Sequence, residues 1–146
     1  MGSIGKSNTI SIEQLQAKIS KLKSYPGARG MTYNPIPFAP VTLRQDIAKV
    51  IGGADIYYLA NKESKLESVP IQALTTLQNY TDRNHLKNLS NVRQDLGNER
   101  LIVYKYNGNY VVADGNHRLA LEYMKGTKNK KVPVIDVNEF ENKYRR

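Results

Sequence analysis

The chain has 146 residues, of which 40% are hydrophobic and 24% are charged, and this is enough for one domain with a real core. It contains no cysteine, which excludes disulfides, thiol catalysis and thiolate metal sites. No run approaches the roughly 18 uninterrupted apolar residues of a transmembrane helix. Residues 1–8 also lack the apolar stretch of a signal peptide. We therefore expect no membrane partner.

The charge balance is strongly basic. The 22 lysines and arginines outnumber the 13 aspartates and glutamates, which gives a net charge of +9. Such a surface attracts polyanions, above all nucleic acid and nucleotides, although a small basic protein need not have such a ligand. The basic residues form several clusters rather than one stripe: Lys18, Lys21 and Lys23; Lys125, Lys128, Lys130 and Lys131; and Lys143, Arg145 and Arg146.

Residues 1–60 are predicted to form a helical, loop-rich leader. Ser11 and Gln14 have the spacing of a capping box, and apolar residues then recur at helical spacing, which predicts a helix over residues 12–22. The segment 27–40 contains repeated glycines and prolines, so we expect an extended connector there.

Residues 61–146 are predicted to form a compact α+β module. A second short helix over residues 43–51 precedes it in the leader. Within the module, residues 69–74 have the pattern of a short strand that runs into a turn. The segment "TDRNHLKNLSNV" over 81–92 has the pattern of a capped amphipathic helix.

A β-hairpin is the clearest element of the second half. The apolar segments 100–106 and 109–114 flank Asn107-Gly108, the strongest short-range signal for a two-residue hairpin turn. Residues 131–137, "KVPVIDV", predict a final strand, and a short basic helical tail follows it. We find no internal repeat.

The pentapeptide "DGNHR" follows the hairpin and contains the candidate site. The strand ends at Asp114, Gly115 permits a sharp bend, and Asn116, His117 and Arg118 occupy the first positions of a helix that continues to a glycine C-cap. A helix start presents unpaired N–H groups and a partial positive charge, which favour an anion. Arg118 can add a bidentate contact to phosphate, and His117 can donate or transfer a proton.

Asp114 is negatively charged, so its presence beside an anion site needs an explanation. Its charge repels an anion unless a cation lies between them, so it is expected to cap the turn, to hold His117 or Arg118, or to bind Mg²⁺ together with a nucleotide. The alternative is purely structural: Asp114 and Asn116 cap the helix, and His117 packs against the fold.

The motif and its surroundings resemble the ParB/sulfiredoxin superfamily. "DGNHR" after a hairpin and before "VPV", with "VPIQALTTLQNYTDRNHLKNL" upstream, is similar to the family's strand, helix and phosphate-binding turn over 69–137, about half of the chain. The leader has no counterpart. The resemblance implies a small mixed sheet with packed helices, and phosphate binding by the turn residues Gly115, Asn116, His117 and Arg118.

The chemistry within this superfamily differs between members. Asn116 stands where sulfiredoxins have their cysteine, which excludes sulfinate reduction, and the turn also differs from that of the chromosome-partition members. Three alternatives remain: a metal-assisted nuclease using Mg²⁺, a free-serine-type kinase using ATP, or a non-catalytic module binding ATP, CTP or DNA. We expect a bacterial cytoplasmic protein or a delivered toxin of a mobile element, with a cognate inhibitor protein if it is a toxin.

Other residues are weaker candidates. His85 is a possible second catalytic group, and Asp82 and Asp136 are possible partners for the carboxylate of Asp114. Glu99-Arg100 is interpreted as a solvated loop pair. Two histidines without cysteine make a dedicated zinc site unexpected.

The ten tyrosines offer rings on which bases can stack. Tyr104, Tyr106 and Tyr110, however, lie in the predicted hairpin, where aromatic cross-strand pairs are ordinary packing. The sequence therefore does not assign a nucleobase to any of them.

Overall fold

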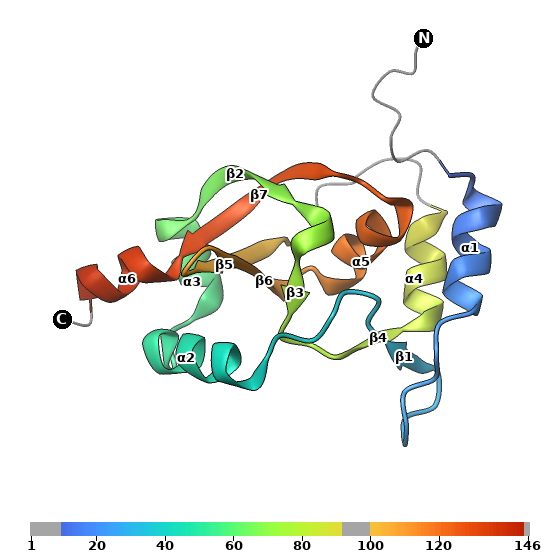
Figure 1. The fold of residues 1–146 in the computed structure, drawn as a ribbon, viewed down its shortest axis with the longest axis horizontal. Coiled ribbons are helices and arrows are strands. Elements are labelled where there is room, and N and C mark those ends of the chain that lie inside the picture. The colour runs from blue at the N-terminus through green and yellow to red at the C-terminus, as the bar shows by residue number, and fades with distance from the viewer. Residues whose placement is uncertain (1–9, 92–99, 145–146) are drawn as a thin grey trace, which may run out of the picture.

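The computed structural model describes residues 10–91 and 100–144. Within these residues a mixed five-stranded sheet lies between two groups of helices, which confirms the predicted α+β class (Figure 1). In chain order the elements are α1 (Ile12–Ser20), β1 (Met31–Tyr33), α2 (Val41–Ile51), α3 (Ile56–Glu63), β2 (Lys65–Pro70), η1 (Ile71–Ala73), β3 (Thr75–Thr76), β4 (Tyr80–Asp82), α4 (Arg83–Ser90), β5 (Ile102–Tyr106), β6 (Asn109–Asp114), α5 (Asn116–Lys125), β7 (Asn129–Asp136) and α6 (Val137–Tyr144).

The sheet has the strand order β2-β7-β5-β6-β3. The pairs β2/β7 and β5/β6 are antiparallel, whereas β5/β7 and β3/β6 are parallel. Strands β1 and β4 form a separate antiparallel ribbon, in which Tyr33 lies opposite Tyr80 and Met31 lies opposite Asp82. The ribbon thus joins the leader to the segment that precedes α4.

Side-chain alternation along the strands produces a core on each face of the sheet. Val103 and Val112 pack with α1, α4 and α5, while Ile102 and Val111 pack with α2, α3 and α6. Figure 1 shows α1, α4 and α5 gathered at one end of the molecule and α6 at the other. The sheet is therefore the middle of three layers, and the end of β6 directs the chain into the layer that contains α5.

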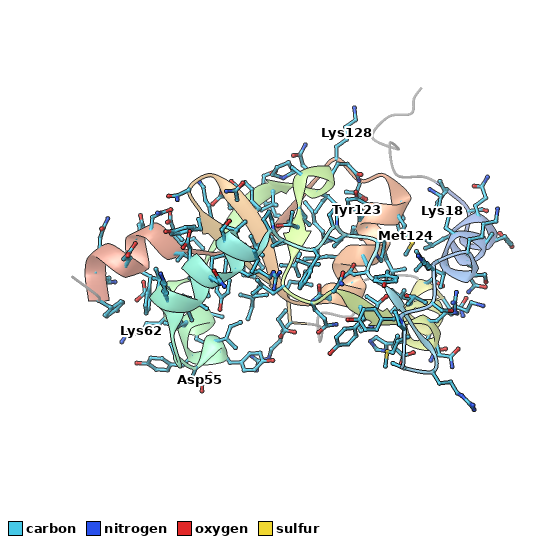
Figure 2. All side chains as sticks on the ribbon, turned by 60° about the horizontal axis from the view of Figure 1, so that its bottom comes forward. Lys18, Asp55, Lys62, Tyr123, Met124 and Lys128 are labelled. Atoms are coloured by element: carbon cyan, nitrogen blue, oxygen red, sulfur yellow. The ribbon has the colours of Figure 1, made fainter. Side chains whose placement is uncertain are left out.

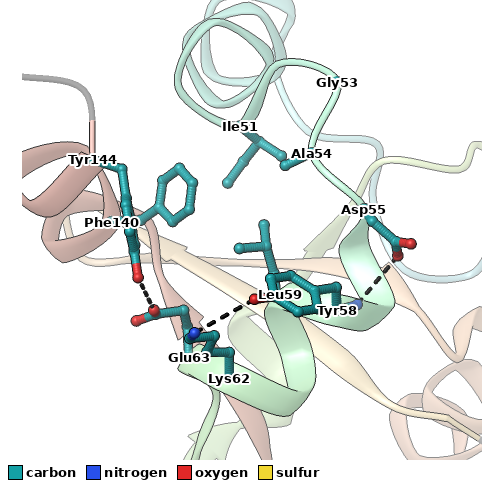
Figure 3. Close-up of a pocket in the computed structure, with 10 residues that line it drawn as sticks. All are labelled: Ile51, Gly53, Ala54, Asp55, Tyr58, Leu59, Lys62, Glu63, Phe140 and Tyr144. Carbon is teal, nitrogen blue, oxygen red and sulfur yellow. Dashed lines mark hydrogen bonds between the residues drawn. The ribbon is translucent and has the colours of Figure 1, made fainter.

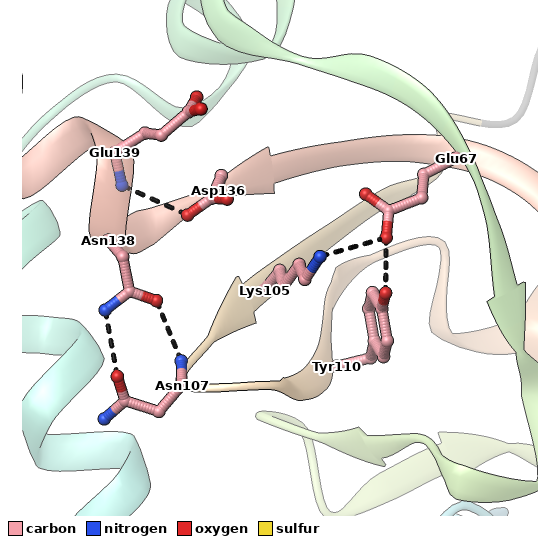
Figure 4. Close-up of polar contacts among 7 residues, drawn as sticks. All are labelled: Glu67, Lys105, Asn107, Tyr110, Asp136, Asn138 and Glu139. Carbon is pink, nitrogen blue, oxygen red and sulfur yellow. Dashed lines mark hydrogen bonds and ion pairs between the residues drawn. The ribbon is translucent and has the colours of Figure 1, made fainter.

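The predicted hairpin is confirmed. Asn107 and Gly108 have φ values of 50° and 82°, the left-handed conformation that a type I′ turn requires. The Asn107 amide N–H donates to Asn138 Oδ1 at 2.8 Å, and Asn138 Nδ2 donates to Asn107 Oδ1 at 2.9 Å (Figure 4). The turn is thereby fastened to α6.

A second polar cluster ties β2 to the hairpin (Figure 4). Glu67 accepts hydrogen bonds from Tyr110 Oη and from Lys105 Nζ, the latter at 3.3 Å. The hydrogen bond to Glu67 raises the pKa of Tyr110 and that of Lys105. Glu67 therefore links three strands through side chains as well as through the sheet.

Several boundaries differ from those that the sequence predicts. The capping box of Ser11 and Gln14 is present, but α1 ends at Ser20. The predicted connector 27–40 contains β1, because this segment pairs with β4 far along the chain. The strand predicted over 69–74 begins earlier as β2, because its pairing with β7 starts at Lys65, and it ends in η1. Helix α3 is not predicted at all.

The leader packs into the same core as the module. Leu15, Ile19 and Ile36 belong to one buried cluster with Val112 and Leu119. Lys18 Nζ also donates to the carbonyl of Met124 at 3.0 Å, and Figure 2 shows these two residues side by side. The division into 1–60 and 61–146 stays a prediction. Residues 1–9, 92–99 and 145–146, which include Val92 of the predicted helix, lie outside the described residues.

Across residues 10–91 and 100–144, each helix is too short or too polar to cross a bilayer.

We expect the Ile19→Ala variant to lower the free energy of unfolding by about 2–5 kcal/mol, because it leaves a cavity in a site with 0% exposure. Ile12, on the same helix, is 46% exposed, so Ile12→Ala should change stability by no more than about 0.5 kcal/mol. Urea unfolding followed by circular dichroism measures both. Equal losses in the two variants would contradict the docking of α1.

Candidate functional site

The turn between β6 and α5 has room only for glycine. Gly115 has a φ of 86°, and a Cβ added there would lie 2.5 Å from Leu101 Cδ2 and 2.6 Å from the Arg100 carbonyl oxygen. Both the backbone conformation and the close approach of residues 100–101 exclude a side chain. The bend predicted at Gly115 therefore depends on the absence of a side chain, because the turn packs closely against the residues just before β5.

Helix α5 begins without a side-chain cap. Ser11, Asp55 and Asp82 cap α1, α3 and α4 by accepting backbone N–H groups, but the N-cap of α5 is Gly115, which has no side chain. Asp114 Oδ1 accepts from the N–H of Gly115 at 2.9 Å, so it closes the turn instead of capping the helix. The first amides of α5, like those of α2, therefore have no side-chain cap, in contrast to those of α1, α3 and α4.

Asn116 holds the helix start in place. Its side chain is 6% exposed, and its Oδ1 accepts hydrogen bonds from Thr76 Oγ1 and from Asn34 Nδ2, the latter at 3.0 Å. Asn34 in turn donates to the Gln78 carbonyl at 2.9 Å and accepts from the Ile36 N–H at 2.9 Å. The side chain of Asn116 is thus held within the fold by these hydrogen bonds.

His117 is held in a neutral form. Its Nε2 accepts the backbone N–H of Asp82 at 2.9 Å, which places the ring proton on Nδ1. Burial, followed by the charge of His85, lowers the pKa of His117 to about 4. At neutral pH this ring is a hydrogen-bond donor through Nδ1 and carries no charge.

The structure brings three of the predicted residues together. The rings of His85 and His117 meet edge to face with their centroids 4.4 Å apart, and Asp82 Oδ1 accepts the N–H of His85 at 3.1 Å. Asp136, at the end of β7, is placed elsewhere. It accepts the N–H of Glu139 at 3.1 Å and lies opposite Lys105 of β5 (Figure 4).

Asp136 is also separated from the turn by a strand. Asp114 on β6 pairs with Ile102 at the start of β5, whereas Asp136 on β7 pairs with Lys105 further along the opposite side of β5. The two carboxylates therefore do not form the pair that the sequence suggested as one option.

Two residues that the sequence analysis did not assign to the site lie beside Asp114. A hydrogen bond to Asp114, together with its charge, raises the pKa of Tyr57. The guanidinium of Arg100 stacks over the Tyr57 ring, with Cζ 4.5 Å from the centroid. Arg100 is exposed, as expected, while Glu99, the other residue of the predicted loop pair, lies outside the described residues. Tyr57 had no sequence signal, because α3 itself was not predicted.

Arg118 lies in the first turn of α5 and is 9% exposed. Arginine keeps its charge at any ordinary pH, so this helical turn carries a fixed positive charge.

Proteins hold metal ions with characteristic sets of ligand side chains. The part of the chain that the structure describes contains no group of three His, Asp or Glu side chains able to hold an ion. Mg²⁺ carried by the phosphates of a nucleotide needs only one or two protein carboxylates, and Asp114 offers one.

No protein-family model, curated protein or solved structure matches this chain. The resemblance to the ParB/sulfiredoxin superfamily therefore depends on the motif and its surroundings alone.

A separate cavity of about 510 Å³ lies between the end of α2, α3 and α6 (Figure 3). Its walls include Ile51, Leu59 and Phe140, and Glu63 accepts the hydroxyl of Tyr144 at 2.7 Å at its edge. This hydrogen bond is the main cause of the lowered pKa of Glu63. The predicted site residues are not part of this cavity's lining.

Acid should destabilise the protein through His117. Its pKa is about 6.5 when unfolded and about 4 when folded, so the unfolded chain binds the extra proton between these values, and stability falls as the pH drops from 6.5 to 4. Between pH 7 and 4.5 we expect a loss of roughly 2–3 kcal/mol from this group. His117→Gln should lack this loss, whereas His85→Gln should retain most of it, in urea unfolding at the two pH values. An unchanged acid response in His117→Gln would contradict the assignment.

Proposed function

We propose that the chain binds phosphate groups of nucleic acid or of a nucleotide at the amino end of α5. The observation that supports this most directly is a helix start without a side-chain cap, set by Gly115 and with Arg118 in its first turn. Such a start offers backbone N–H groups and a partial positive charge to an anion. Arginine adds the planar fork that matches phosphate oxygens.

The electrostatics around the turn agree with an anionic ligand. The chain has a net charge of +9. The negative charge of Asp114 is partly satisfied by the N–H of Gly115 and by the hydroxyl of Tyr57, which reduces its repulsion of a phosphate. His117 is neutral, so it supplies a donor without adding a charge that depends on physiological pH.

Phosphodiester cleavage is a second candidate function, favoured by the contact between His85 and His117. The roles of the two histidines then differ. His117 uses Nε2 to accept a backbone N–H and is a poor base with a pKa of about 4, so it positions its neighbour. His85 is exposed and in contact with His117, so it is the candidate for the general acid or base at a bound phosphodiester.

Replacing Arg118 with alanine should weaken binding of DNA, RNA, ATP or CTP by about 1.5–3 kcal/mol, the range for charge-assisted hydrogen bonds. Calorimetry gives the affinity, and circular dichroism checks that the variant folds, since Arg118 is buried. Arg118→Lys provides a second variant that keeps the charge. Lys125→Ala, at the other end of α5, is the matched control and should bind as the unmodified protein does.

The same titrations separate the two ligand classes. Affinity for nucleic acid should fall steeply between about 50 and 200 mM salt, because each neutralised phosphate releases condensed counterions. A flat response would indicate a small nucleotide. Unchanged affinity for every ligand in a folded Arg118→Ala protein would refute the α5 site.

Cleavage is tested by incubating the protein with DNA and RNA, in Mg²⁺ or in EDTA. We expect His85→Gln to abolish any cleavage and to leave binding intact, while His117→Gln should reduce both. A parallel incubation with ATP and serine tests the kinase alternative by the appearance of phosphoserine. Binding without turnover in all reactions would leave the non-catalytic module as the function.

A further inference from the structure

Three tyrosine rings form a cluster on the β1/β4 ribbon. Tyr33 and Tyr80 lie opposite each other in the strand register. The ring of Tyr25 lies 5.0 Å from that of Tyr33 and 5.5 Å from that of Tyr80, measured between centroids, in edge and tilted arrangements. We call these three residues the tyrosine cluster.

The cluster faces outward. On the other face of the ribbon, Thr32 and Thr81 are fully buried and their hydroxyls are hydrogen-bonded at 2.8 Å. Because side chains alternate along a strand, Tyr33 and Tyr80 point to the opposite side. Tyr80 is 41% exposed, and the tyrosine cluster is not part of either hydrophobic core cluster. Core packing therefore does not account for these rings.

Basic groups accompany the rings. Lys23 Nζ lies 5.7 Å from the centroid of the Tyr33 ring. Lys21 and Arg29, on either side of Tyr25 in the sequence, are both exposed. Surfaces that bind single-stranded nucleic acid combine two components: aromatic rings that stack on the bases, and cations that attract the phosphate backbone.

The cluster is next to the start of α5. Tyr80 and Asp82 lie two residues apart on β4, about 7 Å along the strand. The backbone N–H of Asp82 donates to His117 Nε2 at 2.9 Å, so the residue beyond the cluster touches the DGNHR turn directly. One nucleic-acid strand can then place a phosphate at the start of α5 and a base on the ring of Tyr80.

We propose that the tyrosine cluster stacks unpaired nucleobases, which makes single-stranded nucleic acid the ligand of the α5 site. This inference rests on the proposed phosphate-binding function. In a duplex the faces of the bases are already covered by their neighbours, so an exposed aromatic surface selects unpaired strands.

The test uses a fluorescein-labelled oligothymidine and a duplex of equal length, with anisotropy as the readout. Tyr80→Ala should weaken binding of the single strand about 5- to 150-fold, the range found for loss of one stacked base, and should affect the duplex little. Tyr80→Phe keeps the ring and should bind normally. The control is Tyr58→Ala: this tyrosine is 59% exposed and also has a lysine, Lys62, 5.6 Å from its ring centroid, but it lies on α3.

The outcomes separate this inference from the proposed function. If Arg118→Ala weakens binding and Tyr80→Ala does not, the stacking surface is refuted and the phosphate site stands. If Tyr80→Ala weakens binding and Arg118→Ala does not, the stacking surface stands without the α5 site. Equal losses for duplex and single strand would refute the choice of ligand, and absence of all binding would refute both proposals.

Discussion

The buried amide of Asn116 is the contact on which the arrangement of this molecule depends. A buried polar side chain requires partners, and Asn116 finds them in Asn34 of the leader and Thr76 of β3. These hydrogen bonds join three distant segments at the first residue of α5. Together with the tight turn at Gly115, this junction sets the start of α5, from which His117 contacts β4.

Local signals in the sequence predict the elements that depend on neighbouring residues. The Asn107-Gly108 turn and the Gly115 bend need positive φ values, which their residue types favour whatever lies around them. The β1/β4 ribbon has no such signal, because Tyr33 and Tyr80 become strand residues only by pairing with each other. Helix α3 has a good cap in Asp55, but it buries only Leu59, so its sequence lacks the apolar periodicity from which a helix is predicted.

In the candidate site, too, some features depend on neighbouring residues in the sequence and others on distant contacts. The motif predicts which residues meet at the turn, but their roles depend on burial and on contacts that no spacing encodes. Histidine has an ordinary pKa suited to proton transfer, yet burial and His85 make His117 a neutral donor. The side chain of Asn116 is likewise held by partners inside the fold. Tyr57 and Arg100 approach Asp114 from segments that the sequence did not connect with it.

The hydrogen bond from Lys18 to the carbonyl of Met124 spans 106 residues, and this has a consequence for the order in which the protein folds during synthesis. Helix α1 leaves the ribosome before α4, α5 and β7, and its apolar face packs in one cluster with residues of these later elements. Contacts between such distant segments form late and slow the folding of a domain. The nascent chain therefore exposes Leu15 and Ile19 until these later elements have emerged, and this part of the core closes only after β7 has been made.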